Sequence, residues 1–107
     1  MSSVIFERAA DLAKDIRSAR RTALLREMAT EFVQVLESLP DCRVSEVTAA
    51  PLDRMTTDAD RVIETIEQWI DAGRATDKDE QQLASAVYEI RDAIEQIHHW
   101  RRHYLGA

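Results

Sequence analysis

The sequence predicts an all-α fold, an elongated helical bundle of three main helices spanning about residues 3–38, 51–72 and 77–105. Only two glycines and two prolines occur in 107 residues. Residue types that favour helices are abundant throughout the chain. Apolar residues recur at spacings of three and four, and no strand-like alternation occurs. At this length we expect residues 1–107 to form a single helical domain.

The first predicted helix begins at Ser3, a good N-cap residue, and ends near Ser38, because Pro40 disfavours helical geometry at Leu39. A continuous helix of this length would be roughly 50 Å long. Its apolar face changes direction, because the stripe of the second half lies roughly 160° around the helix from that of the first half. The first stripe is Ile5, Ala9, Leu12, Ile16, Ala19 and Ala23, and the second is Leu25, Met28, Phe32, Val35, Leu36 and Leu39.

Two explanations of this change of face remain open. The helix breaks near Arg20, or it stays continuous and its two halves pack on different partners, one of them in another chain. We favour the continuous helix, because no glycine or proline lies between Ser18 and Thr22. That choice predicts a homodimer, since a long exposed apolar stripe is rare on a soluble monomer.

The second and third predicted helices follow a connection at residues 40–50. Pro51 suits the first turn of a helix, although Thr57 with Asp60 also resembles a capping box and would mark a later start. Trp69 belongs to the apolar stripe of this helix and is expected in the core. Gly73 is a typical C-terminal cap, and a short link leads to Thr76, which caps the next helix, so the two helices should form an antiparallel hairpin.

The net charge of -6 is unevenly distributed. Residues 1–27 and 98–107 are each net basic, whereas residues 28–97 hold 16 of the 20 acidic residues. This polarity favours association with charged partners and disfavours direct nucleic-acid binding. A single cysteine, Cys42, excludes an internal disulfide and is interpreted as an ordinary loop residue. With neither a signal peptide nor a membrane span in the sequence, we expect a cytoplasmic protein that does not bind membranes.

The third predicted helix carries two different faces. Its buried stripe is Leu83, Val87, Ile90, Ile94 and Ile97. The opposite face is rich in aromatic, acidic and histidine side chains, and we predict that it binds a partner. The predicted partner-binding residues are Tyr88, Asp92, Glu95, His99, Trp100 and His103. Alternatively, Trp100 and Tyr104 simply close the end of the bundle.

Metal binding is a weaker hypothesis for the same helix. Glu95 and His98 have the Glu-x-x-His spacing by which ferritin-like proteins present ligands, and His99 and His103 share one face with Glu95. A ferritin-like site needs further inward-facing glutamates, and Glu64 and Glu67 of the second predicted helix lack a partnering Glu-x-x-His, so we expect no metal and no cofactor. Glu95, His98, His99 and His103 remain the candidate ligands.

No glycine-rich phosphate loop and no catalytic Ser/His/Asp set can be identified. The sequence therefore predicts a small, acidic, non-enzymatic protein that binds another protein as an adaptor, regulator or inhibitor. One alternative is a phage-type inhibitor whose acidic middle segment occupies a basic nucleic-acid-binding groove of its target. A second alternative is a ferritin-like or other metal-binding helical protein.

Overall fold

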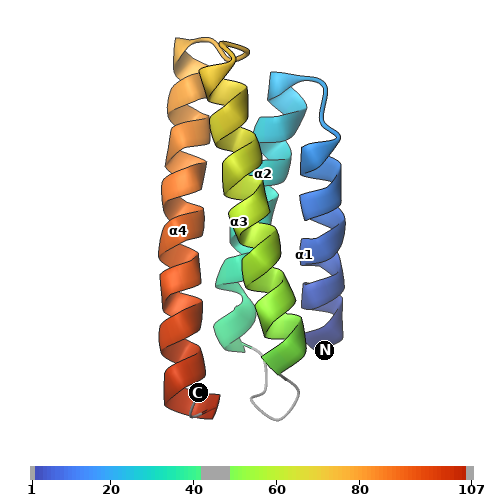
Figure 1. Ribbon diagram of the computed structural model, residues 1–107, viewed down its shortest axis with the longest axis vertical. Helices are drawn as coiled ribbons and strands as arrows, with labels where there is room; N and C mark the ends of the chain where they lie inside the picture. The colour runs from blue at the N-terminus through green and yellow to red at the C-terminus, as the bar shows by residue number, and fades with distance from the viewer. Residues whose placement is uncertain (1, 42–48, 106–107) are drawn as a thin grey trace.

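The computed structural model describes residues 2–41 and 49–105, which form an all-α four-helix bundle (Figure 1). The helices are α1 Ser2–Arg17, α2 Thr22–Glu37, α3 Ala49–Asp71 and α4 Asp77–Leu105, with a short 3-10 helix, η1 Leu39–Asp41, after α2. The prediction of an all-α bundle is confirmed. The prediction of three main helices is wrong, because residues 3–38 form two helices. Cys42 lies outside the described residues.

The helix is interrupted at residues 18–21, although none of them is a glycine or proline. The Ser18 hydroxyl donates to the Lys14 carbonyl at 3.2 Å. The Ala19 amide donates to the Ile16 carbonyl, three residues earlier, also at 3.2 Å. Such local hydrogen bonds compete with continuation of a helix. Arg21 then adopts an extended conformation, with φ -131° and ψ 139°, before α2 begins.

The break allows both apolar stripes of residues 3–38 to face one core. Because the chain reverses at the break, α2 lies antiparallel to α1. The two apolar stripes, which would face different directions on one continuous helix, can then both face the interior of the bundle. Ala9, Leu12 and Ile16 of α1 and Leu25, Phe32 and Leu36 of α2 are all buried. The change of face is therefore explained without a second chain. The expected homodimer loses the observation that motivated it and stays a prediction.

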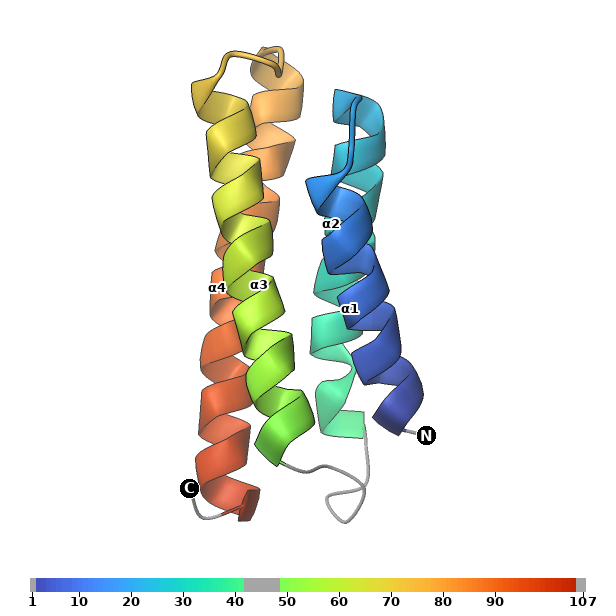
Figure 2. The ribbon, with the colours of Figure 1, turned by 45° about the vertical axis from the view of Figure 1, so that its right-hand side comes forward.

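The four helices form a ring in the order α1, α2, α4, α3, with α1 opposite α4 and α2 opposite α3. The α1–α2 and α3–α4 pairs are antiparallel hairpins, which lie side by side in Figure 2. Their turns lie at the same end of the bundle, and α2 ends and α3 begins at the other end, at opposite corners of the ring. The α3–α4 hairpin predicted from the sequence is confirmed.

Helix α3 begins at Ala49, so the alternative start at Thr57 is wrong. Thr57 lies inside the helix, where its hydroxyl donates to the Asp53 carbonyl. Gly73 ends the segment as predicted, with φ +70°. The Gly73 amide donates to Ile70 at 2.9 Å and the Arg74 amide to Trp69 at 3.3 Å, which is the pattern of a Schellman motif.

The two turns are joined to each other by Thr22 and Arg74. The Thr22 hydroxyl donates to the Arg74 carbonyl at 2.9 Å and accepts the indole N–H of Trp69 at 3.1 Å. The Arg74 guanidinium stacks 3.5 Å from the centre of the Trp69 ring and reaches the Arg20 carbonyl at 3.5 Å. We call Arg20, Thr22, Trp69 and Arg74 the turn-end network. It fastens one hairpin to the other.

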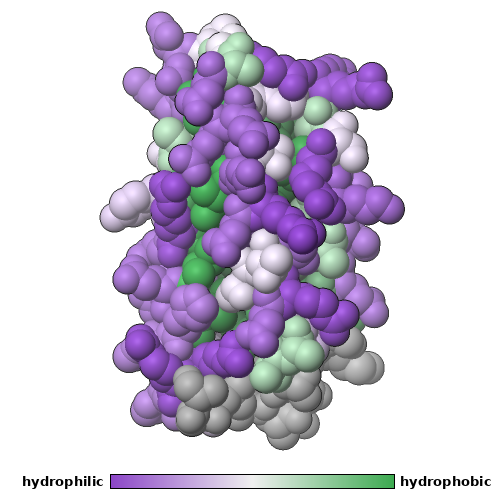
Figure 3. All heavy atoms as spheres, in the orientation of Figure 1, coloured by the Kyte–Doolittle hydropathy of each residue, from purple (hydrophilic) through white to green (hydrophobic). Residues whose placement is uncertain are grey.

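Among the described residues, ion pairs join three of the four neighbouring pairs of helices. Arg8 pairs with Glu31 between α1 and α2, and the hydrogen bond to Glu31 raises the pKa of Arg8. Arg26 pairs with Asp79 between α2 and α4. The α3–α4 seam is bridged by Arg91–Glu67 at 3.0 Å and by Arg101–Asp53. Figure 3 shows hydrophobic atoms in this seam, between mostly hydrophilic flanks.

Candidate partner-binding surface

The outward side of α4 carries five of the six predicted partner-binding residues. Tyr88, Asp92, Glu95, His99 and His103 are all exposed. At 100° per residue they fall within an arc of about 80°, directly away from the core. Tyr88 is 75% exposed, the most exposed large hydrophobic side chain among the described residues. We call these five residues the outer α4 surface.

The carboxylates of this surface are available to a partner. The ion pairs of α3 and α4 use Glu67, Arg91, Asp53 and Arg101, and in the described part of the chain neither Asp92 nor Glu95 pairs with a base. The surface therefore combines an exposed aromatic ring, two acidic groups and two histidines on one rigid helix.

Trp100, the sixth predicted residue, lies elsewhere. Its side chain is only 8% exposed and packs on Tyr104, with ring centroids 5.4 Å apart. His103 contacts the same tyrosine edge-on at 4.6 Å. Tyr104 itself is 54% exposed. Trp100 is thus buried at this end of the bundle, in contact with Tyr104, and is not part of the outer α4 surface.

A groove connects Trp100 to the outer α4 surface. It runs between the C-terminal end of α2, η1 and the C-terminal half of α4, with a volume of about 260 Å³. Apolar side chains form most of its wall, and three polar side chains line it. The lining residues are Leu36, Glu37, Leu39, Pro40, Asp92, Ala93, Gln96, Ile97 and Trp100. We call this the α2–α4 groove.

Sequence reasoning singled out Asp92 and Trp100 but missed the groove that they share. The groove depends on how α2 and η1 lie against α4, which no local pattern specifies. One signal was present in the sequence: Ala93, a small residue, stands between Ile90 and Ile97 on the buried side of α4, and it lines the groove together with Leu36.

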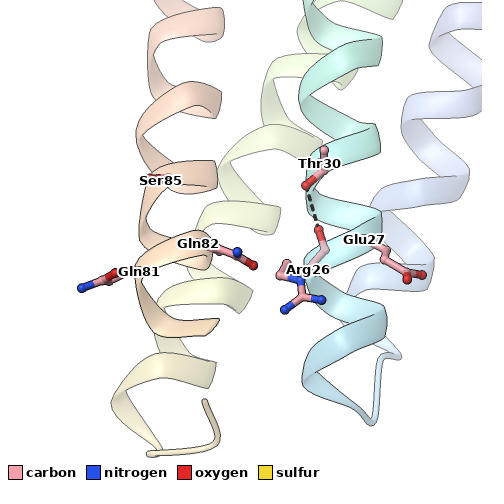
Figure 4. Close-up of a pocket in the computed structure, with 6 residues that line it drawn as sticks. All are labelled: Arg26, Glu27, Thr30, Gln81, Gln82 and Ser85. Carbon is pink, nitrogen blue, oxygen red and sulfur yellow. Dashed lines mark hydrogen bonds between the residues drawn. The ribbon is translucent and has the colours of Figure 1, made fainter. Parts of the chain in front are cut away.

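A second hollow lies between α2 and α4 nearer the turns (Figure 4). It is wide and open, about 650 Å³, and is lined by Arg26, Glu27, Thr30, Gln81, Gln82 and Ser85. Figure 4 shows Gln82 extending toward α2, whereas Gln81 and Glu27 point away. The Thr30 hydroxyl donates to the Arg26 carbonyl, and Arg26 itself pairs with Asp79. The lining set offers neither a histidine nor a cysteine to serve as base or nucleophile beside Ser85.

The candidate metal ligands are not gathered into a site. Glu95, His98, His99 and His103 are all exposed along α4. Within residues 2–41 and 49–105, no three histidine, cysteine, aspartate or glutamate side chains are placed to hold a metal ion together.

Comparisons of the chain with protein-family models, with curated proteins and with solved structures find no match. In the described part of the chain, no helix combines the length and apolarity that crossing a membrane requires.

Proposed function

We propose that this chain is a small non-enzymatic protein that acts by binding another protein, as an adaptor, regulator or inhibitor, and that the outer α4 surface is its binding face. The observation that carries the proposal is the exposure of Tyr88 in the middle of α4. Tyrosine is enriched among the residues that dominate binding energy at protein interfaces, because it buries a large ring at low entropic cost.

The surroundings of Tyr88 support the same function. The helix that carries it is held by a buried stripe containing Leu83, Ile90 and Ile97, so the outer α4 surface is presented on a rigid element. Asp92 and Glu95 follow Tyr88 by about one and two turns on the same face of α4 and favour a partner with basic groups. The hollows described above are open and lack a convergent catalytic set, which favours binding over catalysis.

Affinity capture from the native host tests this proposal. The bait protein carries either Tyr88→Ala or Glu95→Lys, and Val4→Ala is the control, because Val4 is an exposed apolar residue on α1, across the bundle from α4. We expect a specific protein partner whose capture falls at least about tenfold with either α4 variant, the loss expected for a hot-spot residue. Capture that is unchanged in both variants would place the binding face elsewhere.

A second candidate is the phage-type inhibitor that blocks a basic nucleic-acid-binding groove. The acidic residues on the outward side of α3 favour it. Five carboxylates follow one another there at helical spacing: Asp53, Asp60, Glu64, Glu67 and Asp71. The same capture performed at about 0.5 M salt, where the screening length is a few Å, separates the two. A partner that is lost at high salt and with Glu64→Lys supports electrostatic blocking through α3.

A further inference from the structure

The α2–α4 groove is too small to enclose a whole ligand. Its volume of about 260 Å³ is below the roughly 300–1,000 Å³ of small-molecule sites. It does have an apolar floor made by Leu36, Ile97 and the Trp100 indole, all of which are buried in the bundle. A hollow of this shape suits one or two apolar side chains presented by a larger partner.

The charged side chains that line the groove are acidic among the residues that the structure describes. Glu37 stands on the α2 side and Asp92 on the α4 side, and none of the described lining residues is basic. Of the ion pairs among the described residues, none involves Glu37 or Asp92. A partner that inserts an apolar side chain must therefore bring basic groups to both rims to match these two carboxylates.

The groove is continuous with the proposed binding face. Asp92 belongs both to the rim and to the outer α4 surface, so one partner can contact Tyr88 and the groove together. The floor and rim lie between two helices, which is how grooves that receive an amphipathic helix are built.

Resting on the proposed function, we infer that the α2–α4 groove receives the apolar side of a basic amphipathic helix of the partner protein, with its lysine or arginine side chains paired to Glu37 and Asp92. Ala93 also lines the groove, so a larger side chain at this position should narrow it.

A defined peptide tests this inference without the native partner. The probe is a dye-labelled amphipathic helix of about four turns, with leucines on one side and lysines on the other. Binding is measured by fluorescence anisotropy, and the binding site by amide NMR shifts. We expect shifts at Ala93, Gln96 and Ile97 and at the Trp100 indole. A peptide with glutamates in place of the lysines should not bind.

Two matched charge reversals localise the binding. Glu37→Lys should weaken the lysine peptide at least about tenfold, whereas Glu64→Lys, an equal change of charge on the outward side of α3, should weaken it less than about twofold. Ala93→Leu should also weaken binding at least about tenfold with no change of charge. If that variant fails to fold, the NMR shifts of the unchanged protein still decide the question.

Several results would overturn the inference: no binding of the lysine peptide, equal binding of the glutamate peptide, or equal losses in Glu37→Lys and Glu64→Lys. Self-association of the protein that disappears in Glu37→Lys would assign the groove to a second copy instead. If the host partner is lost with Tyr88→Ala but retained with Glu37→Lys and Ala93→Leu, the proposed function stands and the groove inference fails.

Discussion

The two tryptophans mark opposite ends of the bundle and are held in different ways. Trp69 is 6% exposed, donates its indole N–H to Thr22 and is covered by the Arg74 guanidinium. Trp100 is 8% exposed, yet it lines the α2–α4 groove and packs on a half-exposed Tyr104. Nearly equal burial therefore hides a difference in surroundings: the turn end is closed by specific contacts, whereas the opposite end keeps the α2–α4 groove.

The largest effects are expected when each tryptophan is truncated, which tests whether the two ends differ in packing. Trp69→Ala should lower the free energy of unfolding by about 3–5 kcal/mol, the usual cost of deleting a large buried aromatic side chain. Trp100→Ala should cost roughly 1–2 kcal/mol less, because on the groove side its ring already lacks packing partners. Urea denaturation of both variants measures the difference, and equal losses would show that the two ends are equally well packed.

The turn-end network can be weakened at its hydroxyl. Thr22→Val removes one oxygen that serves two hydrogen bonds, to Trp69 and Arg74, and should lower the free energy of unfolding by about 1–2 kcal/mol. Thr30→Val is the matched control, because the Thr30 hydroxyl bonds only to the Arg26 carbonyl within its own helix. That variant should stay within about 0.5 kcal/mol of the parent in thermal melts. Similar losses in both would mean that the network does not join the hairpins energetically.

The smallest of these effects is expected at Gly73. Its φ of +70° is unfavourable for residues with a Cβ, and no atom lies within 4 Å of the position that a Cβ would take. Gly73→Ala should therefore cost about 1 kcal/mol through the backbone alone. Gly73→Asn should cost less, since asparagine tolerates this conformation better. Chemical denaturation of the pair checks the order, and a larger loss for asparagine would contradict it.

The helices after residue 49 were predictable because their signals are local. Gly73 marks the turn, and the stripe from Leu52 to Ile70 is buried or half-buried as its spacing indicates. The exposure of Tyr88 and its neighbours followed from the same 100° periodicity. Local periodicity is thus sufficient to sort inward from outward residues on a single helix.

The break at residues 18–21 was not predicted, because it contains no glycine or proline and a high helix propensity does not require continuity. The change of apolar face indicated either a break or a continuous helix with two different packing partners. The structure has the break, and its longest dimension is 43 Å, shorter than the roughly 50 Å of an unbroken helix. The α2–α4 groove was also beyond sequence reasoning, because it arises where Leu36 of α2 and Ala93 of α4, which lie far apart in the sequence, line one hollow.

The pairing of the four helices into two consecutive hairpins has a consequence for the order of folding. Contacts inside a hairpin join residues close in sequence, such as Arg8 with Glu31 or Glu67 with Arg91, which are 23 and 24 residues apart. Contacts between hairpins are far longer in range: Thr22 and Arg74 are 52 residues apart, and Arg26 and Asp79 are 53. Since closing a longer loop costs more entropy, we expect each hairpin to form early and their docking to limit the folding rate. The hydrogen bonds of Thr22 then belong to the last contacts made, and their loss should speed unfolding more than it slows folding.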